Sequence, residues 1–156
     1  MSVKMKKNMK IIEKYPKNII VDTCFWIAYF EPTDNQHKNA REWSEVIFDY
    51  HVFCPFPTLY EFLNTRFSRK KNNQINEFDV LIKKKVISFI YDDDYRKNIL
   101  NSYVDTNKYF SQFSLVDMII SRMIDDINLK IDYLFTYNSK DFIRICNKRN
   151  VELLPS

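Results

Sequence analysis

Glycine is missing from this chain of 156 residues. Glycine-rich loops bind phosphates in P-loop NTPases and in dinucleotide-binding domains, because a residue without a side chain lets the backbone approach the phosphate closely. The absence of glycine therefore excludes both kinds of loop. Any chemistry on a phosphate group would depend on side chains or on a metal ion.

Cysteine is scarce and odd in number, and Cys24, Cys54 and Cys146 show no CxxC spacing. Each lies in a hydrophobic segment, so we expect free buried thiols rather than disulfides or a zinc site. This usage predicts a reducing compartment, the cytoplasm. The sequence also lacks the roughly 18 apolar residues of a membrane span and the apolar stretch of a secretion signal, so we expect neither a membrane protein nor a secreted one.

What the chain does contain is apolar residues at 46% of its positions and a formal net charge of +4. This length and composition predict one domain with one sizeable core. Residues 1–17 are rich in lysine, so we expect a basic N-terminal extension followed by a domain over residues 18–156. The modest positive charge fits a nucleic-acid partner and equally fits an ordinary soluble protein.

From Asn18 onward, short β-rich runs alternate with longer amphipathic stretches. The alternation predicts βαβ units and an α/β fold with a parallel sheet. The expected strands cover residues 18–21, 51–55, 86–91, 131–136 and 151–154. The expected helices cover about 24–30, a stretch to 48 capped by Asp34 or Asn35, 57–68, 75–83, a stretch after the acidic run 92–94, 114–126 and 139–149.

Several acidic residues lie at or near the ends of expected strands. Asp22 closes the first strand, Glu61 lies one turn into the helix after the second, and Asp117 lies in the first turn of the helix before the fourth. Asn138 and Asp141 follow the fourth strand. Sites in open parallel sheets form beyond the carboxyl ends of the strands, so adjacent strands would bring these oxygen-bearing side chains to one rim.

Crowded carboxylates repel one another unless a cation neutralises them, and hard oxygen ligands favour Mg²⁺ or Mn²⁺. Such an ion lowers the pKa of a coordinated water and stabilises the charge that develops during phosphodiester hydrolysis. The pattern therefore indicates metal-dependent cleavage of a phosphodiester.

Each acid also has a simpler interpretation. Ser114 with Asp117, and Asn138 with Asp141, have the spacing of a helix cap. Asp22 can cap the helix that follows it, and Glu61 taken alone is a solvated charge. Capping does not predict the joint placement of all these acids at strand ends.

Four ordered segments resemble the motifs of PIN-domain nucleases. Ile20-Val21-Asp22-Thr23 resembles the strand that delivers the first acid, and the segment 57–65 resembles the helix of the second. Ser114-Leu115-Val116-Asp117 resembles the third motif, and the segment 135–142 resembles the fourth, in a variant with both Asn and Asp. Asp34 and His37 are placed like the Asp-x-x-His helix start of many members. The match runs from Asn18 to the C-terminus.

The resemblance implies a three-layer α/β/α PIN-like fold with a central parallel sheet. It implies a metal-dependent endoribonuclease, most like the VapC toxins of bacterial toxin–antitoxin pairs, with RNA as substrate, a small antitoxin protein as partner and a homodimeric state. Carried over to this sequence, Asp22, Glu61 and Asp117 are expected to bind Mg²⁺ or Mn²⁺. The fourth catalytic position, Asp141 or Asn138, stays open. The polar supports are expected to be Thr23, Ser114, Thr136 and Asn138.

Two further groups are candidates for RNA contacts. A basic patch just past the Glu61 helix can hold the phosphate backbone, with a solvated helix end as the alternative; it consists of Arg66, Arg69, Lys70 and Lys71. Tyr109, Phe110 and Phe113 can stack on unpaired bases, with packing as the alternative.

Two other functions stay open on the sequence alone. The chain can be a binding module that keeps the fold without catalysis. It can also be a nuclease of the same chemistry that acts on DNA or in housekeeping RNA processing.

Overall fold

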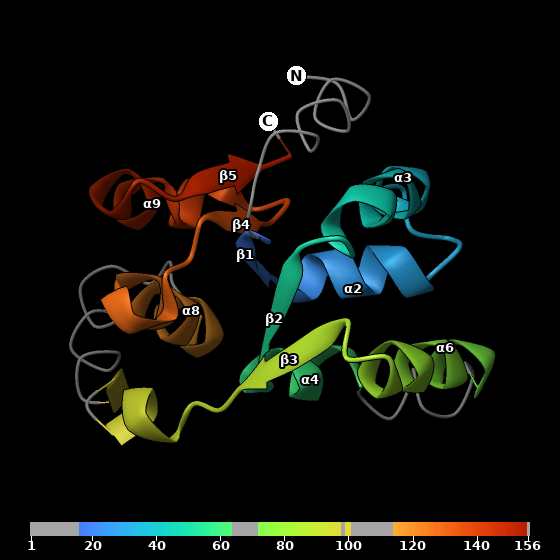
Figure 1. Ribbon diagram of the computed structural model, residues 1–156, viewed down its shortest axis with the longest axis horizontal. Helices are drawn as coiled ribbons and strands as arrows, with labels where there is room; N and C mark the ends of the chain where they lie inside the picture. Colours follow the sequence, from blue (N-terminus) through green and yellow to red (C-terminus); the bar gives the residue numbers. More distant parts are fainter. Residues whose placement is uncertain (1–15, 64–71, 98, 101–113, 156) are drawn as a thin grey trace.

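The computed structural model describes residues 16–63, 72–97, 99–100 and 114–155 (Figure 1). Nearly all of the expected N-terminal extension lies outside the described residues, as do the basic residues 66–71 and the aromatic residues 109–113. Those expectations stay predictions.

Five strands form one parallel sheet in the order β3-β2-β1-β4-β5. The strands are β1 (Asn18–Val21), β2 (His51–Pro55), β3 (Ile87–Ile90), β4 (Tyr133–Phe135) and β5 (Glu152–Leu154). The chain adds strands outward from β1 to β3 and then returns to place β4 on the other side of β1. The strand order thus reverses between β1 and β4, and in open parallel sheets such a reversal marks the crevice where ligands bind.

Helices cover both faces of the sheet, which gives three layers (Figure 1). One face carries α2 (Thr23–Phe30), α3 (His37–Ile47), α4 (Phe56–Phe62) and α6 (Asn72–Lys83). The other carries α8 (Leu115–Asp125) and α9 (Ile143–Arg149), together with helical residues 93–97 and 99–100. Successive residues of a strand point to opposite faces, so Ile19 and Val21 join the first core and Ile20 joins the second. The expected three-layer fold is confirmed.

Trp26 on α2 is the centre of an aromatic cluster in the first core. Its ring lies 5.7–6.4 Å, centroid to centroid, from those of Phe30, Phe48, Phe62 and Phe78. These rings come from α2 itself, the end of α3, α4 and α6. Buried aromatic side chains contribute large apolar areas, so this cluster fixes α2 against α4.

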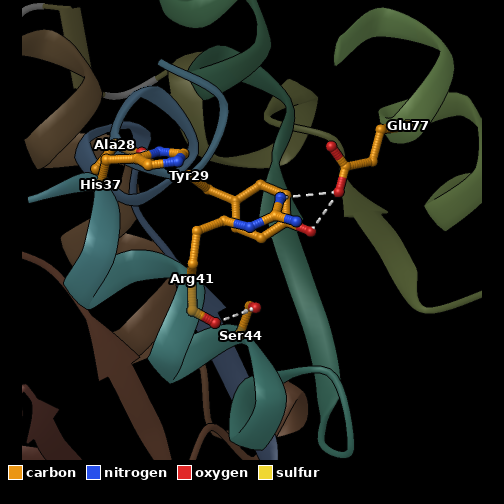
Figure 2. A network of polar contacts seen from close by, with 6 residues as sticks. All are labelled: Ala28, Tyr29, His37, Arg41, Ser44 and Glu77. Atoms are coloured by element: carbon orange, nitrogen blue, oxygen red, sulfur yellow. Dashed lines mark hydrogen bonds and ion pairs between the residues drawn. The ribbon is translucent and has the colours of Figure 1, made fainter. Parts of the chain in front are cut away.

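A polar network joins α2, α3 and α6 on the outside of this layer (Figure 2). The Tyr29 hydroxyl donates to Glu77 Oε1 at 2.7 Å, and Arg41 donates to the same oxygen at 2.9 Å while lying 4.2 Å from the centre of the Tyr29 ring. His37 at the start of α3 places its Nδ1 2.7 Å from the Ala28 carbonyl oxygen. The network steadies the helix that begins directly after Asp22.

Several expected element ends differ from the structure. The expected cap of the second helix is wrong, because α3 begins at His37 with Gln36 as N-cap, and Asp34 instead accepts a hydrogen bond from the Gln36 N–H at 2.7 Å. The helix expected over 57–68 begins at Phe56 and ends at Phe62. Thr58 in the first turn of α4 is fully buried and donates to the Pro55 carbonyl at 2.7 Å, so burial does not leave its hydroxyl unpaired.

The segment after β4 also differs from the helix expected over 139–149. It divides into a short 3₁₀ turn, η3 (Ser139–Asp141), and α9. The fully buried Phe142 lies between the two, at the N-cap of α9. A second 3₁₀ turn, η2 (Ile127–Leu129), follows α8.

The three cysteines are free, as expected. Cys54 and Cys146 are buried, whereas Cys24 is only partly so. In the described ranges, no helix combines the length and the apolar character needed to cross a bilayer.

Candidate active site

Asp22 stands at the point where the strand order reverses. It follows β1 directly, and its backbone N–H donates to the Phe135 carbonyl of β4 at 3.0 Å. The residue is 7% exposed. Its Oδ1 accepts the Thr23 N–H at 2.7 Å, and therefore Asp22 is also the N-cap of α2, as its simpler interpretation predicted.

The second oxygen of Asp22 is held by two side chains. Oδ2 accepts hydrogen bonds from the Thr136 hydroxyl at 2.8 Å and from the Cys24 thiol at 3.3 Å. Burial raises the pKa of Asp22 above its ordinary value, these hydrogen bonds oppose the shift, and the negative charge of Asp117 adds to it. The carboxylate is thus fixed in position, and its negative charge is disfavoured by burial and by Asp117. A bound cation would offset both effects.

Glu61 on α4 reaches toward the start of α2. Its Oε2 accepts a short hydrogen bond from the Thr23 hydroxyl. Although the residue is exposed as a whole, partial desolvation of its carboxylate raises the pKa, and the charges of Asp22 and Asp117 raise it further while Thr23 opposes the shift. Glu61 is therefore electrostatically coupled to both other acids, which a solvated surface charge would not be.

Asp117 lies in the first turn of α8 and forms a capping box with Ser114. The Ser114 hydroxyl accepts the Asp117 N–H at 3.0 Å, and Asp117 Oδ2 accepts the Ser114 N–H at 3.2 Å. The capping interpretation is confirmed, and Asp117 has a second effect besides capping. The Asp117 charge also raises the pKa values of Asp22 and Glu61.

The three acids thus come together on one rim, within electrostatic reach of each other. Their donor set is made of carboxylate oxygens, which fits a hard divalent cation and not a soft one. In the ranges that the structure describes, however, no three or more His, Cys, Asp or Glu side chains are already arranged to hold an ion. Glu61 and Asp117 each turn one oxygen to a local hydrogen-bond partner, Thr23 and Ser114 respectively. Binding of an ion would require these side chains to close around it.

The fourth acidic region is connected to Asp22 through Thr136. This threonine is 2% exposed, donates to Asp22 and accepts the Asn138 N–H at 3.0 Å. The Asn138 side-chain amide in turn donates to the Asp141 carboxylate. Asp141 is not among the charges that shift the pKa of Asp22 or Glu61, so its place in the site stays a prediction.

Cys24 lies beside Asp22, although the sequence indicated only a buried thiol at this position. Its sulfur accepts the Tyr137 N–H at 3.2 Å and donates to Asp22. Burial and the nearby Asp22 charge raise the pKa of the thiol to about 12, so it keeps its proton at neutral pH. The sequence held one signal of this contact, because Cys24 lies two residues after Asp22, at the start of an expected helix.

This arrangement defines a class of protein: a parallel α/β/α domain with an acidic rim at the carboxyl ends of its central strands. The chain belongs to the PIN domain family, whose model matches residues 19–148. Among solved structures, the chain is similar to the Mycobacterium tuberculosis toxin VapC20, described as cleaving the sarcin–ricin loop. The two share 17% sequence identity with a TM-score of 0.61, over 81% of this chain and 94% of the other. Comparison with curated proteins gave no match.

Proposed function

We propose that this protein is a Mg²⁺- or Mn²⁺-dependent endoribonuclease that uses Asp22, Glu61 and Asp117 as metal ligands. The observation that carries the proposal is the state of Asp22. A carboxylate that is 7% exposed, at the reversal point of a parallel sheet, has a pKa raised both by burial and by a second acid. Such an arrangement is costly for a purely structural group and is typical of functional sites.

The chain's own residues would hold each ligand in place. Thr136 and Cys24 fix Asp22, Thr23 orients Glu61, and Ser114 fixes the backbone turn that carries Asp117. When bound, the ion supplies an activated water and stabilises the developing charge on the phosphodiester. We assign the fourth catalytic position to Asp141, with Asn138 orienting it.

RNA as the substrate is supported by family membership and by the likeness to VapC20, a toxin described as cleaving an RNA loop. In this proposal the protein is the toxin of a toxin–antitoxin pair, acts in the cytoplasm as a homodimer and is restrained by a small antitoxin. The basic patch contacts the phosphate backbone of the RNA; its residues are Arg66, Arg69, Lys70 and Lys71.

The decisive test compares Asp22→Asn with Glu42→Gln, an exposed acid on α3 that serves as the matched control. The control should cleave RNA in Mg²⁺ or Mn²⁺ as wild type does, and Asp22→Asn should not. Calorimetric titration with Mn²⁺ should show binding to the control and none to Asp22→Asn. Full cleavage by pure, folded Asp22→Asn contradicts the proposal.

A non-catalytic binding module of the same fold is the alternative. It is favoured by the lack, in the described ranges, of a ready-made group of ion ligands. The Mn²⁺ titration separates the two, since a binding module would take up no ion and cleave no RNA. Single-stranded DNA of the same sequence, assayed beside the RNA, tests whether the enzyme is directed at DNA.

A further inference from the structure

A small group of aromatic side chains lies on the same edge of the sheet as the acids. Phe56 opens α4 directly after β2, Tyr60 lies one helical turn later, and Tyr91 follows β3. The Phe56 and Tyr91 rings are stacked with centroids 5.0 Å apart and planes at 27°, and the Tyr60 ring meets Phe56 edge-on at 5.5 Å. We call these three rings the aromatic platform.

The platform is exposed, although aromatic rings usually belong to the core. Tyr60 is 71% exposed and Tyr91 is 61% exposed. Phe56, which is only partly exposed, anchors the group by packing against Phe89 of β3 with ring centroids 6.4 Å apart. The two tyrosines are therefore held in place by a fixed ring and present their own rings to solvent.

The strand register relates the platform to the acid rim. In the strand register, Ile20 pairs with Phe53 and Pro55 pairs with Ile90. Continuing this register by two residues places Asp22 level with Pro55 and Ile90. The next residues along the chain are Phe56 and Tyr91. Two strand spacings amount to about 10 Å, which is on the order of three nucleotides at the rise of stacked bases. Glu61 is also the next residue after Tyr60.

We propose that the aromatic platform stacks on an unpaired base of the RNA, a few nucleotides from the phosphodiester held at the acid rim. This inference rests on the proposed function, because it places the platform in the path of the same substrate. Bases stack on exposed aromatic side chains in proteins that bind single strands, and every base offers such a face.

Size and charge favour a base over other occupants. The exposed parts of the two tyrosines amount to roughly 300 Å², whereas a stable protein interface buries about 800 Å² on each partner. Beside Tyr91, Arg96 donates to Asp93 at 2.6 Å and lies 3.9 Å from Asp92. Because Arg96 is already paired with these two acids, we expect Tyr91 to contact the base of the RNA and not its phosphate.

The test is a binding measurement in chelator, where cleavage cannot occur. Fluorescence anisotropy would follow a labelled oligoadenylate and a chain of the same length in which abasic sugars replace the bases. Tyr60→Ala combined with Tyr91→Ala should weaken oligoadenylate binding roughly tenfold or more and leave the abasic chain unaffected. Tyr60→Phe with Tyr91→Phe, which keeps the rings, should bind as wild type does. Ile127→Ala removes a side chain that is 70% exposed, outside the platform, and should also bind normally.

The outcomes separate this inference from the proposed function. Unchanged oligoadenylate binding by the double alanine variant, while wild type cleaves RNA, overturns the platform and leaves the nuclease. If the double alanine variant loses the preference for oligoadenylate over the abasic chain, but wild type cleaves no RNA, the platform is supported and the nuclease proposal is overturned. A double alanine variant that binds oligoadenylate normally but changes oligomeric state in ultracentrifugation shows a protein interface and overturns the platform.

Discussion

The Thr136 hydroxyl donates a 2.8 Å hydrogen bond to Asp22 Oδ2 across the boundary between β4 and β1. The two residues are 114 positions apart in the sequence, yet both come directly after neighbouring strands. Thr136 also accepts the Asn138 N–H at 3.0 Å, so one hydroxyl connects the first acid to the loop of the fourth. The position of Asp22 therefore depends on a residue that is not itself an acid.

Replacing Thr136 by Val should weaken catalysis much more than it weakens the fold. Valine has a similar shape but neither donates to Asp22 nor accepts from Asn138. Loss of a group that orients a metal ligand typically costs 10- to 100-fold in metal affinity or activity, and we expect a loss of about that size in Mn²⁺ affinity and in RNA cleavage. Thr136→Ser keeps the hydroxyl and should retain most of both. Equal cleavage by Thr136→Val and wild type would show that Asp22 needs no such support.

The raised pKa of Asp22 predicts how stability depends on pH without metal. Between the ordinary Asp pKa of 3.8 and the raised value, the folded protein binds more protons than the unfolded chain. Stability must therefore fall as pH rises through this window, by about 1.4 kcal/mol for each unit of pKa difference. Asp22→Asn does not titrate there, and it also removes one of the charges that raise the pKa of Glu61.

The measurement is urea unfolding of both proteins in chelator from about pH 4 to about pH 8. Fluorescence of the buried Trp26 and Trp43 reports unfolding. The free energy of unfolding of wild type should decline relative to that of Asp22→Asn as pH rises. A parallel course of the two curves would mean that burial does not perturb this carboxyl group.

A divalent ion should reverse this destabilisation. An ion that binds only the folded state stabilises it by about 2.7 kcal/mol at a concentration 100 times its Kd. Mn²⁺ should therefore raise the melting temperature of wild type and of Glu42→Gln, and leave that of Asp22→Asn unchanged. A rise of equal size in all three proteins would indicate binding elsewhere on the surface.

The alternation of short apolar runs with amphipathic stretches predicted an α/β fold with a parallel sheet, and the resemblance to PIN-domain nucleases implied its three layers. β1 and β2 begin and end at the expected residues. The helix ends were less predictable, since they depend on tertiary packing. The helix expected over 57–68 shows this, because α4 ends at Phe62. The burial of a polar residue is equally hard to predict: Thr58 lies fully buried and its hydroxyl donates to the Pro55 carbonyl.

The acids were predictable by their positions at strand ends, and the structure places three of them on one rim. The hydrogen bonds between Thr23 and Glu61 and between Cys24 and Asp22 were not predictable as pairs. The first joins residues 38 positions apart, and its partners meet only because the aromatic cluster packs α2 against α4. In the second, the thiol of Cys24, which was expected only to be buried in the core, donates a hydrogen bond to the Asp22 carboxylate.

The capping box of α8 gives a last prediction, in which a structural and a catalytic effect can be separated. Ser114→Ala removes the acceptor of the Asp117 N–H and should lower the free energy of unfolding by about 1 kcal/mol. It should also lower the rate of RNA cleavage, because the first turn of α8, which carries Asp117, is then held less firmly. Ser114→Asp, which restores a capping oxygen, should recover the stability in urea unfolding, but its added charge beside Asp117 should alter Mn²⁺ affinity. If Ser114→Ala loses the expected stability yet cleaves RNA as fast as wild type, Ser114 is a helix cap alone and does not position Asp117 for catalysis.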